Sequence, residues 1–168
     1  MAKTISFTGK HNIDKINNNV QAIRLHMETL NDTDLLHKKQ IDMLNKLYTD
    51  CMFPLKSLLE KELEKKISGY KAQDIKKELH VSTELISLAE TIEKLIATKL
   101  RCYYCKSEVY LLYKNVREPS QWTLDRMDNS KGHSHLNTVI ACLKCNLQRR
   151  VTHIDKFTFT KSLVLKKV

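Results

Sequence analysis

Two stretches in the C-terminal third decide the fold: WTLDRMDNSKGHSHLN at residues 122–137 and, shortly after it, CLKCN at residues 142–146. The segments 121–125 and 138–142 are rich in Trp, Thr, Val and Ile, a composition that favours β-strands. Between them lies the polar loop 128–135, and from 143 to 150 the pattern changes to that of a short helix. The sequence therefore predicts strand, loop, strand and helix in this order, preceded by a further strand over residues 109–113.

Cysteines flank this unit. Four of the five form two C-x-x-C pairs, namely Cys102 with Cys105 and Cys142 with Cys145. Each two-residue spacer turns both sulfurs of its pair to one side, so two pairs can surround one zinc ion tetrahedrally. A disulfide framework is the alternative, and it fits poorly with an odd cysteine count and no apolar leader. We expect one structural Zn²⁺ per chain, and we expect the lone Cys51 to be a small buried apolar residue.

In the order and spacing of these motifs, residues 101–150 resemble the HNH endonuclease family, and most closely its zinc-containing members from phages, large DNA viruses and bacteria. The resemblance implies a ββα-metal (His-Me finger) unit that grips the DNA backbone around one catalytic Mg²⁺ or Mn²⁺. It also implies that Asp125 and Asn146 are ligands of that ion. Asn137 matches the middle asparagine of the motif, which is expected to hold the loop by hydrogen bonds without touching the metal.

One position departs from the family. Arg126 occupies the place where the family has its general-base histidine, and an arginine stays protonated and cannot accept a proton from water. It can instead bind the scissile phosphate through two N–H donors. His133 and His135 in the loop have an ordinary pKa of about 6.5 and are the candidate bases. The alternative is that both are ordinary loop histidines.

The charge is concentrated in the same part of the chain. The formal net charge is +10, and residues 100–168 hold 13 basic and 5 acidic residues, whereas residues 1–99 are nearly balanced. Such an excess predicts a polyanionic partner, here DNA, although a solvated lysine-rich surface is the alternative. The expected phosphate contacts are Arg126, Lys131, Lys144, Arg149, Arg150 and Lys156, with Lys161, Lys166 and Lys167 in the basic tail. Phe157 and Phe159 alternate with threonines, which predicts a terminal strand.

Residues 1–99 are predicted to form a helical arm, because glycine and proline are scarce (3 and 2 in 168 residues) and apolar residues recur at steps of three and four. The apolar stripes run over 13–30, 41–51, 55–67 and 85–95; Pro54 interrupts them, Gly69 ends the third, and the last helix starts at Ser82. Ile13, Ile16, Val20, Ile23 and Met27 are expected on a buried face. Packing within one chain and a coiled-coil homo-oligomer both explain these stripes.

A helix-turn-helix pattern over residues 74–86 is weak. The helix that would read DNA carries Glu84, Glu90 and Glu93 ahead of its first basic residue, and carboxylates repel phosphates. Ordinary helix packing is therefore expected for this segment.

Together these features predict an α+β protein: a helical arm at 1–99 and a small zinc-stapled ββα-metal domain at 100–168, which should fold alone if the arm is a separate unit. The expected function is a metal-dependent DNA endonuclease of HNH type. An HNH-fold DNA-binding protein without cleavage and a helical scaffold, for example of a viral particle, are the alternatives. No run of 18 apolar residues and no secretory leader are present, so we expect no membrane span and an intracellular or virion location.

Overall fold

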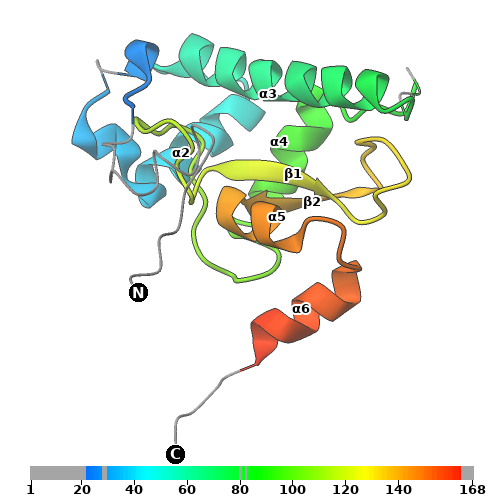
Figure 1. Cartoon of the computed structure of the whole chain (residues 1–168). Helices are drawn as coiled ribbons and strands as arrows, with labels where there is room; N and C mark the ends of the chain where they lie inside the picture. The colour runs from blue at the N-terminus through cyan, green and yellow to red at the C-terminus, as the bar shows by residue number, and fades with distance from the viewer. Residues whose placement is uncertain (1–21, 28–29, 80, 82, 164–168) are drawn as a thin grey trace, which may run out of the picture.

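The computed structural model describes residues 22–27, 30–79, 81 and 83–163 and is of α+β class (Figure 1). The helices are α2 (His37–Tyr48), α3 (Lys56–Lys76), α4 (Leu88–Ala97), α5 (Leu143–Arg149) and α6 (Ile154–Ser162); the strands are β1 (Trp122–Arg126) and β2 (Thr138–Cys142). Two short 3₁₀ helices, Leu25–Met27 and Asp32–Leu35, precede α2. The predictions for Ile13, Ile16, Val20, Lys166 and Lys167 fall outside the described residues.

The strands form an antiparallel hairpin that leads directly into α5. Trp122 lies opposite Cys142 and Arg126 opposite Thr138, and every residue of β1 is buried. Helix α5 packs on both strands, while the long helix α3 extends across the molecule beside β1 (Figure 1). The predicted order of strand, loop, strand and helix is therefore confirmed, with both strands within a residue of their expected bounds.

Helix α3 provides the hydrogen bonds that β1 lacks on its outer edge. The Leu124 amide donates to the Tyr70 hydroxyl at 2.9 Å, and the Lys66 ammonium donates to the Trp122 carbonyl. An unpaired strand edge exposes N–H and C=O groups that otherwise need water or another chain. Side chains of α3 meet this requirement, so the helix is fixed against the hairpin.

One hydrophobic core joins the two halves of the chain. Leu59 and Leu63 of α3, Leu95 of α4, and Trp122 and Leu124 of β1 are all buried in the same cluster. Helices α2 and α3 both pack on α4 within the chain, and α4 in turn packs on β2. The core is thus continuous across residue 99, where the sequence suggested a boundary.

The predicted strand over 109–113 is wrong. Its only pairing among the described residues is one parallel bridge between Tyr110 and Gln121. The buried Gln40 side chain of α2 accepts hydrogen bonds from the Leu111 and Leu112 amides and donates to the Leu112 carbonyl. Because a side chain satisfies this backbone, no strand partner is needed.

Helix bounds in the first half also differ from expectation. Helix α3 continues through Gly69 to Lys76, and α4 begins after Ser87, not at Ser82. Ser87 and Glu90 form a capping box, which fixes the start of α4. Residues 77–87 are not helical where they are described, and Leu85 forms a bridge with Ser134, so no helix-turn-helix is present there.

Three further expectations about burial and conformation are wrong. Ile23 is 55% exposed in an extended bridge with Asn115, although Met27 is buried as expected. Cys51 lies exposed in the turn after α2. Phe157 and Phe159 belong to α6, which His153 caps by accepting a hydrogen bond from the Asp155 amide.

We predict that residues 100–168 will not fold without residues 1–99. The fragment would expose the face of the hairpin that α4 covers and leave the edge of β1 without Tyr70 and Lys66. The expected NMR spectrum of the zinc-loaded fragment is poorly dispersed, against a dispersed spectrum of the full chain. A dispersed fragment spectrum would show that the two segments are independent domains.

Candidate active site and metal centre

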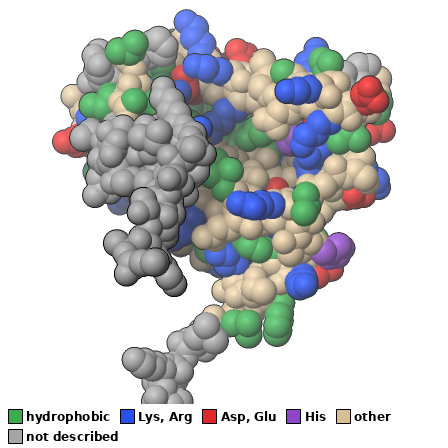
Figure 2. All heavy atoms as spheres, viewed as in Figure 1, with side chains coloured by type: hydrophobic (Ala, Val, Ile, Leu, Met, Phe, Trp, Pro, Cys, Tyr) green, Lys and Arg blue, Asp and Glu red, His purple; other side chains and the backbone are tan. Residues whose placement is uncertain are grey.

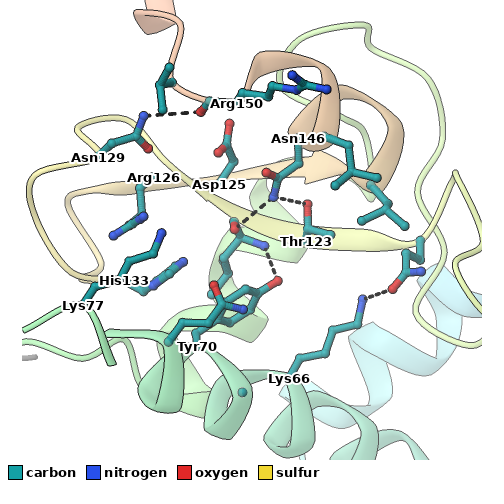
Figure 3. A pocket seen from close by; sticks show the side chains of 17 residues that line it. Lys66, Tyr70, Lys77, Thr123, Asp125, Arg126, Asn129, His133, Asn146 and Arg150 are labelled. Atoms are coloured by element: carbon teal, nitrogen blue, oxygen red, sulfur yellow. Dashed lines mark hydrogen bonds between the residues drawn. The ribbon is translucent and has the colours of Figure 1, made fainter. Parts of the chain in front are cut away.

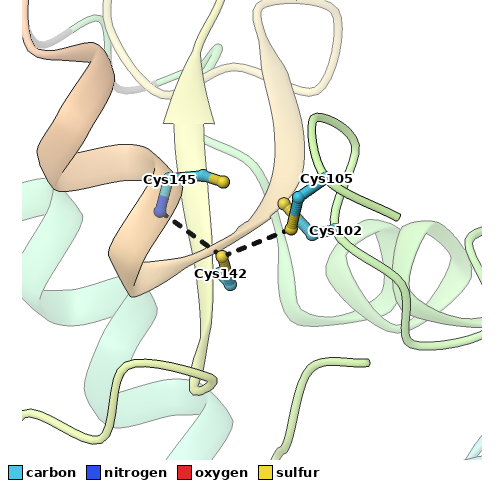
Figure 4. A group of neighbouring side chains, drawn as sticks. All are labelled: Cys102, Cys105, Cys142 and Cys145. Carbon is cyan, nitrogen blue, oxygen red and sulfur yellow. Dashed lines mark hydrogen bonds between the residues drawn. The ribbon is translucent and has the colours of Figure 1, made fainter. Parts of the chain in front are cut away.

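The four paired cysteines meet at one point, as their spacing predicts (Figure 4). Their sulfurs all lie within 4.8 Å of one another, and Cys105 Sγ is 3.9 Å from Cys142 Sγ. The two sulfurs of a disulfide lie about 2.05 Å apart. Four sulfurs that bind one ion tetrahedrally, each at about 2.3 Å, lie about 3.8 Å from one another, which is close to the separation seen here. All four are free thiols, and the group can hold a structural metal ion.

Two hydrogen bonds connect the cysteine cluster to the hairpin. The Tyr103 amide, inside the first C-x-x-C pair, donates to the Ile140 carbonyl of β2 at 2.7 Å. The next residue, Tyr104, donates its hydroxyl to Asp125 Oδ2 at 2.6 Å. A metal that closes this knuckle therefore also fixes the side chain that orients Asp125.

We predict about one zinc per chain in elemental analysis of the native protein, because four thiolates at this spacing are a typical zinc site. Cys142→Ser should lose the metal and lower the melting temperature, since Cys142 lies at the junction of β2 and α5. Cys51→Ser is the matched control: its thiol is exposed and outside the cluster, so zinc content should not change. Full zinc occupancy in the Cys142→Ser protein would contradict the site.

A cleft of about 730 Å³ lies between α3 on one side and β1 with α5 on the other (Figure 3). It brings together five of the residues expected in the active site or on DNA. They are Asp125, Arg126, His133, Asn146 and Arg150. Lys131, Lys144 and Lys156 are exposed elsewhere on the surface, outside the lining of this cleft.

Asp125 is held in the wall of the cleft by a buried arginine. Arg149 Nε donates to Asp125 Oδ2 at 2.6 Å and Arg149 Nη2 donates to Oδ1 at 2.9 Å. With the Tyr104 hydroxyl also on Oδ2, both lone pairs of Oδ2 are used and one on Oδ1 is left. Asp125 can therefore offer one oxygen to a cation.

Arg149 differs from its expected role as a phosphate contact. Its side chain is buried, and its Nη1 and Nη2 atoms also donate to the Thr152 and Arg126 carbonyls and to Asn129 Oδ1. Because only 1% of the residue is exposed, the guanidinium is not available to DNA. It serves to orient and neutralise Asp125.

Asn146 offers a second oxygen beside Asp125. Its amide nitrogen donates to Thr123 Oγ1 at 3.1 Å and to the Leu124 carbonyl at 3.4 Å, which fixes the side chain against β1 (Figure 3). None of the described residues donates a hydrogen bond to its side-chain oxygen, and the residue lines the cleft. Mg²⁺ commonly takes one or two protein oxygens and keeps water or phosphate in its other positions, so this pair fits such an ion.

Asn137 makes the loop hydrogen bonds expected of the middle asparagine. Its side-chain oxygen accepts from the Asp128 amide at 2.9 Å, and its nitrogen donates to the carbonyls of Asp128 and Gly132. These bonds close the loop between β1 and β2. The side chain is buried within the loop and is not among the residues that line the cleft.

Arg126 lines the cleft but is tethered. Its Nη1 donates to the Lys131 carbonyl at 3.1 Å and lies 3.8 Å from Asp74 Oδ1. Only 8% of the residue is exposed. Its Nε and Nη2 groups donate to no acceptor among the described residues, so this side chain can bind a phosphate group that enters the cleft.

His133 is positioned by a carboxylate that the sequence pattern did not indicate. His133 Nδ1 lies 2.7 Å from Asp74 Oδ1, the His133 amide donates to Asp74 Oδ2 at 2.7 Å, and the ring stacks on Tyr70. A carboxylate on Nδ1 favours the tautomer whose Nε2 accepts a proton. Burial lowers the pKa of His133 below its ordinary value, while Asp74 partly opposes this effect, so the ring is neutral at neutral pH.

Gly132 makes this contact feasible. A Cβ at this position would lie 2.7 Å from the Leu79 carbonyl oxygen and 3.1 Å from Asp74 Oδ2. The loop can therefore approach the end of α3 only with a glycine there. The glycine before His133 is the one signal in the sequence that hints at a close approach, but it does not name Asp74 as the partner.

His135 lies apart from this arrangement. It is partly exposed, its Nδ1 is 3.9 Å from Glu90 Oε1, and it lines a different hollow with Leu136 and His153. Of the two candidate bases, only His133 faces the cleft with Asp125 and Asn146.

Comparisons with known proteins identify no relative: no family model, curated protein or solved structure matches the chain. Within the described residues, no helix has both the length and the apolar character needed to cross a membrane.

Proposed function

We propose that this protein is a metal-dependent DNA endonuclease of HNH type, with a structural zinc in the cysteine cluster and its catalytic site in the cleft between α3 and β1. The observation that carries this proposal is the convergence of Asp125, Asn146, Arg126 and His133 on one cleft. Asp125 supplies a carboxylate oxygen and Asn146 an amide oxygen. Arg126 supplies a fixed positive charge, and His133 supplies a neutral imidazole. Hydrolysis of a phosphodiester needs this set of groups.

Asp125 Oδ1 and the Asn146 side-chain oxygen would hold the catalytic Mg²⁺ or Mn²⁺. When bound, the ion supplies charge stabilisation at the scissile phosphate and at the leaving oxygen. Arg126 binds a non-bridging phosphate oxygen, since its position is fixed by the Lys131 carbonyl and Asp74. His133 Nε2 accepts the proton of the attacking water, while Asp74 holds the ring through Nδ1.

A DNA-binding protein without cleavage is the second candidate. The observation that favours it is the engagement of Asp125 by Arg149, which neutralises the carboxylate; Arg149 and Tyr104 together use three of its four lone pairs. A cation at Asp125 is then held less tightly than by a free carboxylate. Nicking assays separate the two candidates, because both require salt-sensitive DNA binding.

We predict that the protein nicks supercoiled plasmid and cuts circular single-stranded DNA with Mg²⁺ or Mn²⁺ but not with chelator. Asn146→Ala should abolish cleavage because it removes a metal ligand, and Asn146→Asp should retain it because a carboxylate oxygen replaces the amide oxygen. Asn146 is preferable to Asp125 as the first target, since Asp125→Ala leaves the buried Arg149 unpaired. Zinc content should stay the same in both Asn146 variants, and an active Asn146→Ala protein would reject the site.

The two loop histidines should differ. His133→Ala should lower the cleavage rate by about 10²–10⁴-fold, the usual contribution of a general base, whereas His135→Ala should leave it near the wild-type value. Arg126→Ala should weaken DNA binding as well as cleavage, because its role is charge on a phosphate. Equal losses from His133→Ala and His135→Ala, measured in single-turnover assays, would contradict this assignment.

Asp74→Asn should change the pH profile of cleavage as well as its rate. Asp74 raises the pKa of His133, so its removal lowers that pKa, and the acid limb of the profile moves to lower pH. The maximal rate should fall because the amide no longer selects the productive tautomer. Asp155→Asn, at an exposed carboxylate in the first turn of α6, is the control with an unchanged profile. A lower rate with an unshifted acid limb would indicate that Asp74 is only structural.

A further inference from the structure

Helix α3 forms a second wall opposite the candidate catalytic groups. Its residues in the cleft are spaced by one or three positions and share one face of the helix, namely Lys66, Gly69, Tyr70 and Gln73; Lys77 lines the cleft directly after the end of α3. The other wall consists of β1 together with Asn146, Leu147 and Arg150 (Figure 3). The candidate cation site therefore lies between two helices and not on an open surface.

The catalytic groups are recessed in this cleft. Asp125, Arg126 and His133 are 5%, 8% and 4% exposed, and the cleft volume is in the range of pockets that enclose ligands of small-molecule size, about 300–1,000 Å³. Proteins that read a duplex place a helix or ribbon into its groove. Here the ligand must instead enter between two protein walls, which a single extended strand can do.

The charge of the cleft suits such a strand. Lys77, directly after α3, and Arg150, directly after α5, are exposed on opposite walls, and Arg126 lies deeper; Figure 2 shows lysine and arginine side chains around a hollow on this face of the molecule. Among the described residues, Asp125 is the only carboxylate in the lining, and Arg149 neutralises it. Lys66 adds less than a full positive charge at neutral pH, because burial lowers its pKa to about 7.

The rim on the α5 side is apolar. Leu147 is 62% exposed and Val151 is 86% exposed, and both line the cleft. Single-stranded DNA presents unstacked bases to such surfaces while its phosphates contact cations. In a continuous duplex the base faces are stacked inside and are not available.

Gly69 leaves space in the wall of the cleft that α3 forms. It lies in the interior of α3, where a glycine is unfavourable compared with alanine, and a Cβ there would meet nothing within 4 Å. Packing inside the protein therefore does not require this glycine. Its missing side chain widens the cleft next to Tyr70 and Gln73.

We propose that the cleft between α3 and the β1–α5 unit binds one single strand of DNA, with phosphates between Lys77 and Arg150 and bases against Leu147 and Val151. This inference deepens the proposed nuclease function and rests on it for the identity of the ligand. The substrate is then a single-stranded or locally unpaired segment, and not a continuous duplex.

The test is fluorescence anisotropy in chelator with a labelled oligonucleotide, alone and annealed to its complement. We expect the single strand to bind at least about tenfold more tightly than the duplex. Gly69→Leu should weaken single-strand binding about tenfold and Gly69→Ala less, while neither lowers the melting temperature, because both residues favour the helix more than glycine does. Lys77→Gln should reduce the salt slope by about 0.7, whereas Lys71→Gln, exposed on α3 outside the cleft, should not.

Equal or tighter duplex binding, no DNA binding, or full affinity of the Gly69→Leu protein would overturn the proposal. The chelator makes this outcome independent of catalysis. Single-strand binding without cleavage under any metal would reject the nuclease function and leave the strand-binding cleft standing. Cleavage of intact duplex without a preference for single strands would reject the strand-binding cleft and leave the nuclease function standing.

Discussion

The buried pair of Asp125 and Arg149 is the interaction on which the rest of the site depends. Arg149 joins α5 to β1, to the Thr152 carbonyl beyond the helix and to Asn129 in the loop, and it does so through one side chain. Tyr104, which lies within the first C-x-x-C pair, connects the cysteine cluster to the same carboxylate. Removal of either charge would leave the other buried and unpaired, at a typical cost of about 3–5 kcal/mol.

This pair also sets the electrostatic character of the cleft. A free carboxylate at Asp125 would repel phosphate, whereas the neutralised one leaves Arg126, Arg150 and Lys77 to determine the sign of the potential. The same neutralisation reduces the affinity of Asp125 for a cation. The proposed ion is then held jointly by Asn146, water and the phosphate of the substrate, so that it binds best when the strand is present.

The second constraint is the contact between α3 and the hairpin. Tyr70 and Lys66 satisfy the edge of β1, and Asp74, four residues after Tyr70, orients His133. Residues of one helical face thus complete a strand, position the candidate base and line the cleft. The helices of the first hundred residues therefore share a core and a cleft with the hairpin, and a substitution in α3 can affect a site that is formed by residues 122–146.

The sequence by itself determined the local features, namely the hairpin followed by α5 and the convergence of the four cysteines. These depend on short spacings and on strand and turn preferences. The loop hydrogen bonds of Asn137 and the shared cleft of Asp125 and Asn146 were expected only from the resemblance to the HNH family. The tertiary structure alone decided that Arg149 binds Asp125, that Asp74 binds His133, that Gln40 replaces a strand partner at 111–112 and that α3 covers the cleft. The first three are contacts of an ionisable or amide side chain with a partner that only folding brings near. Residue type and spacing carry no information on such partners, because a charged residue that pairs inside the protein and one that contacts solvent look the same in a sequence.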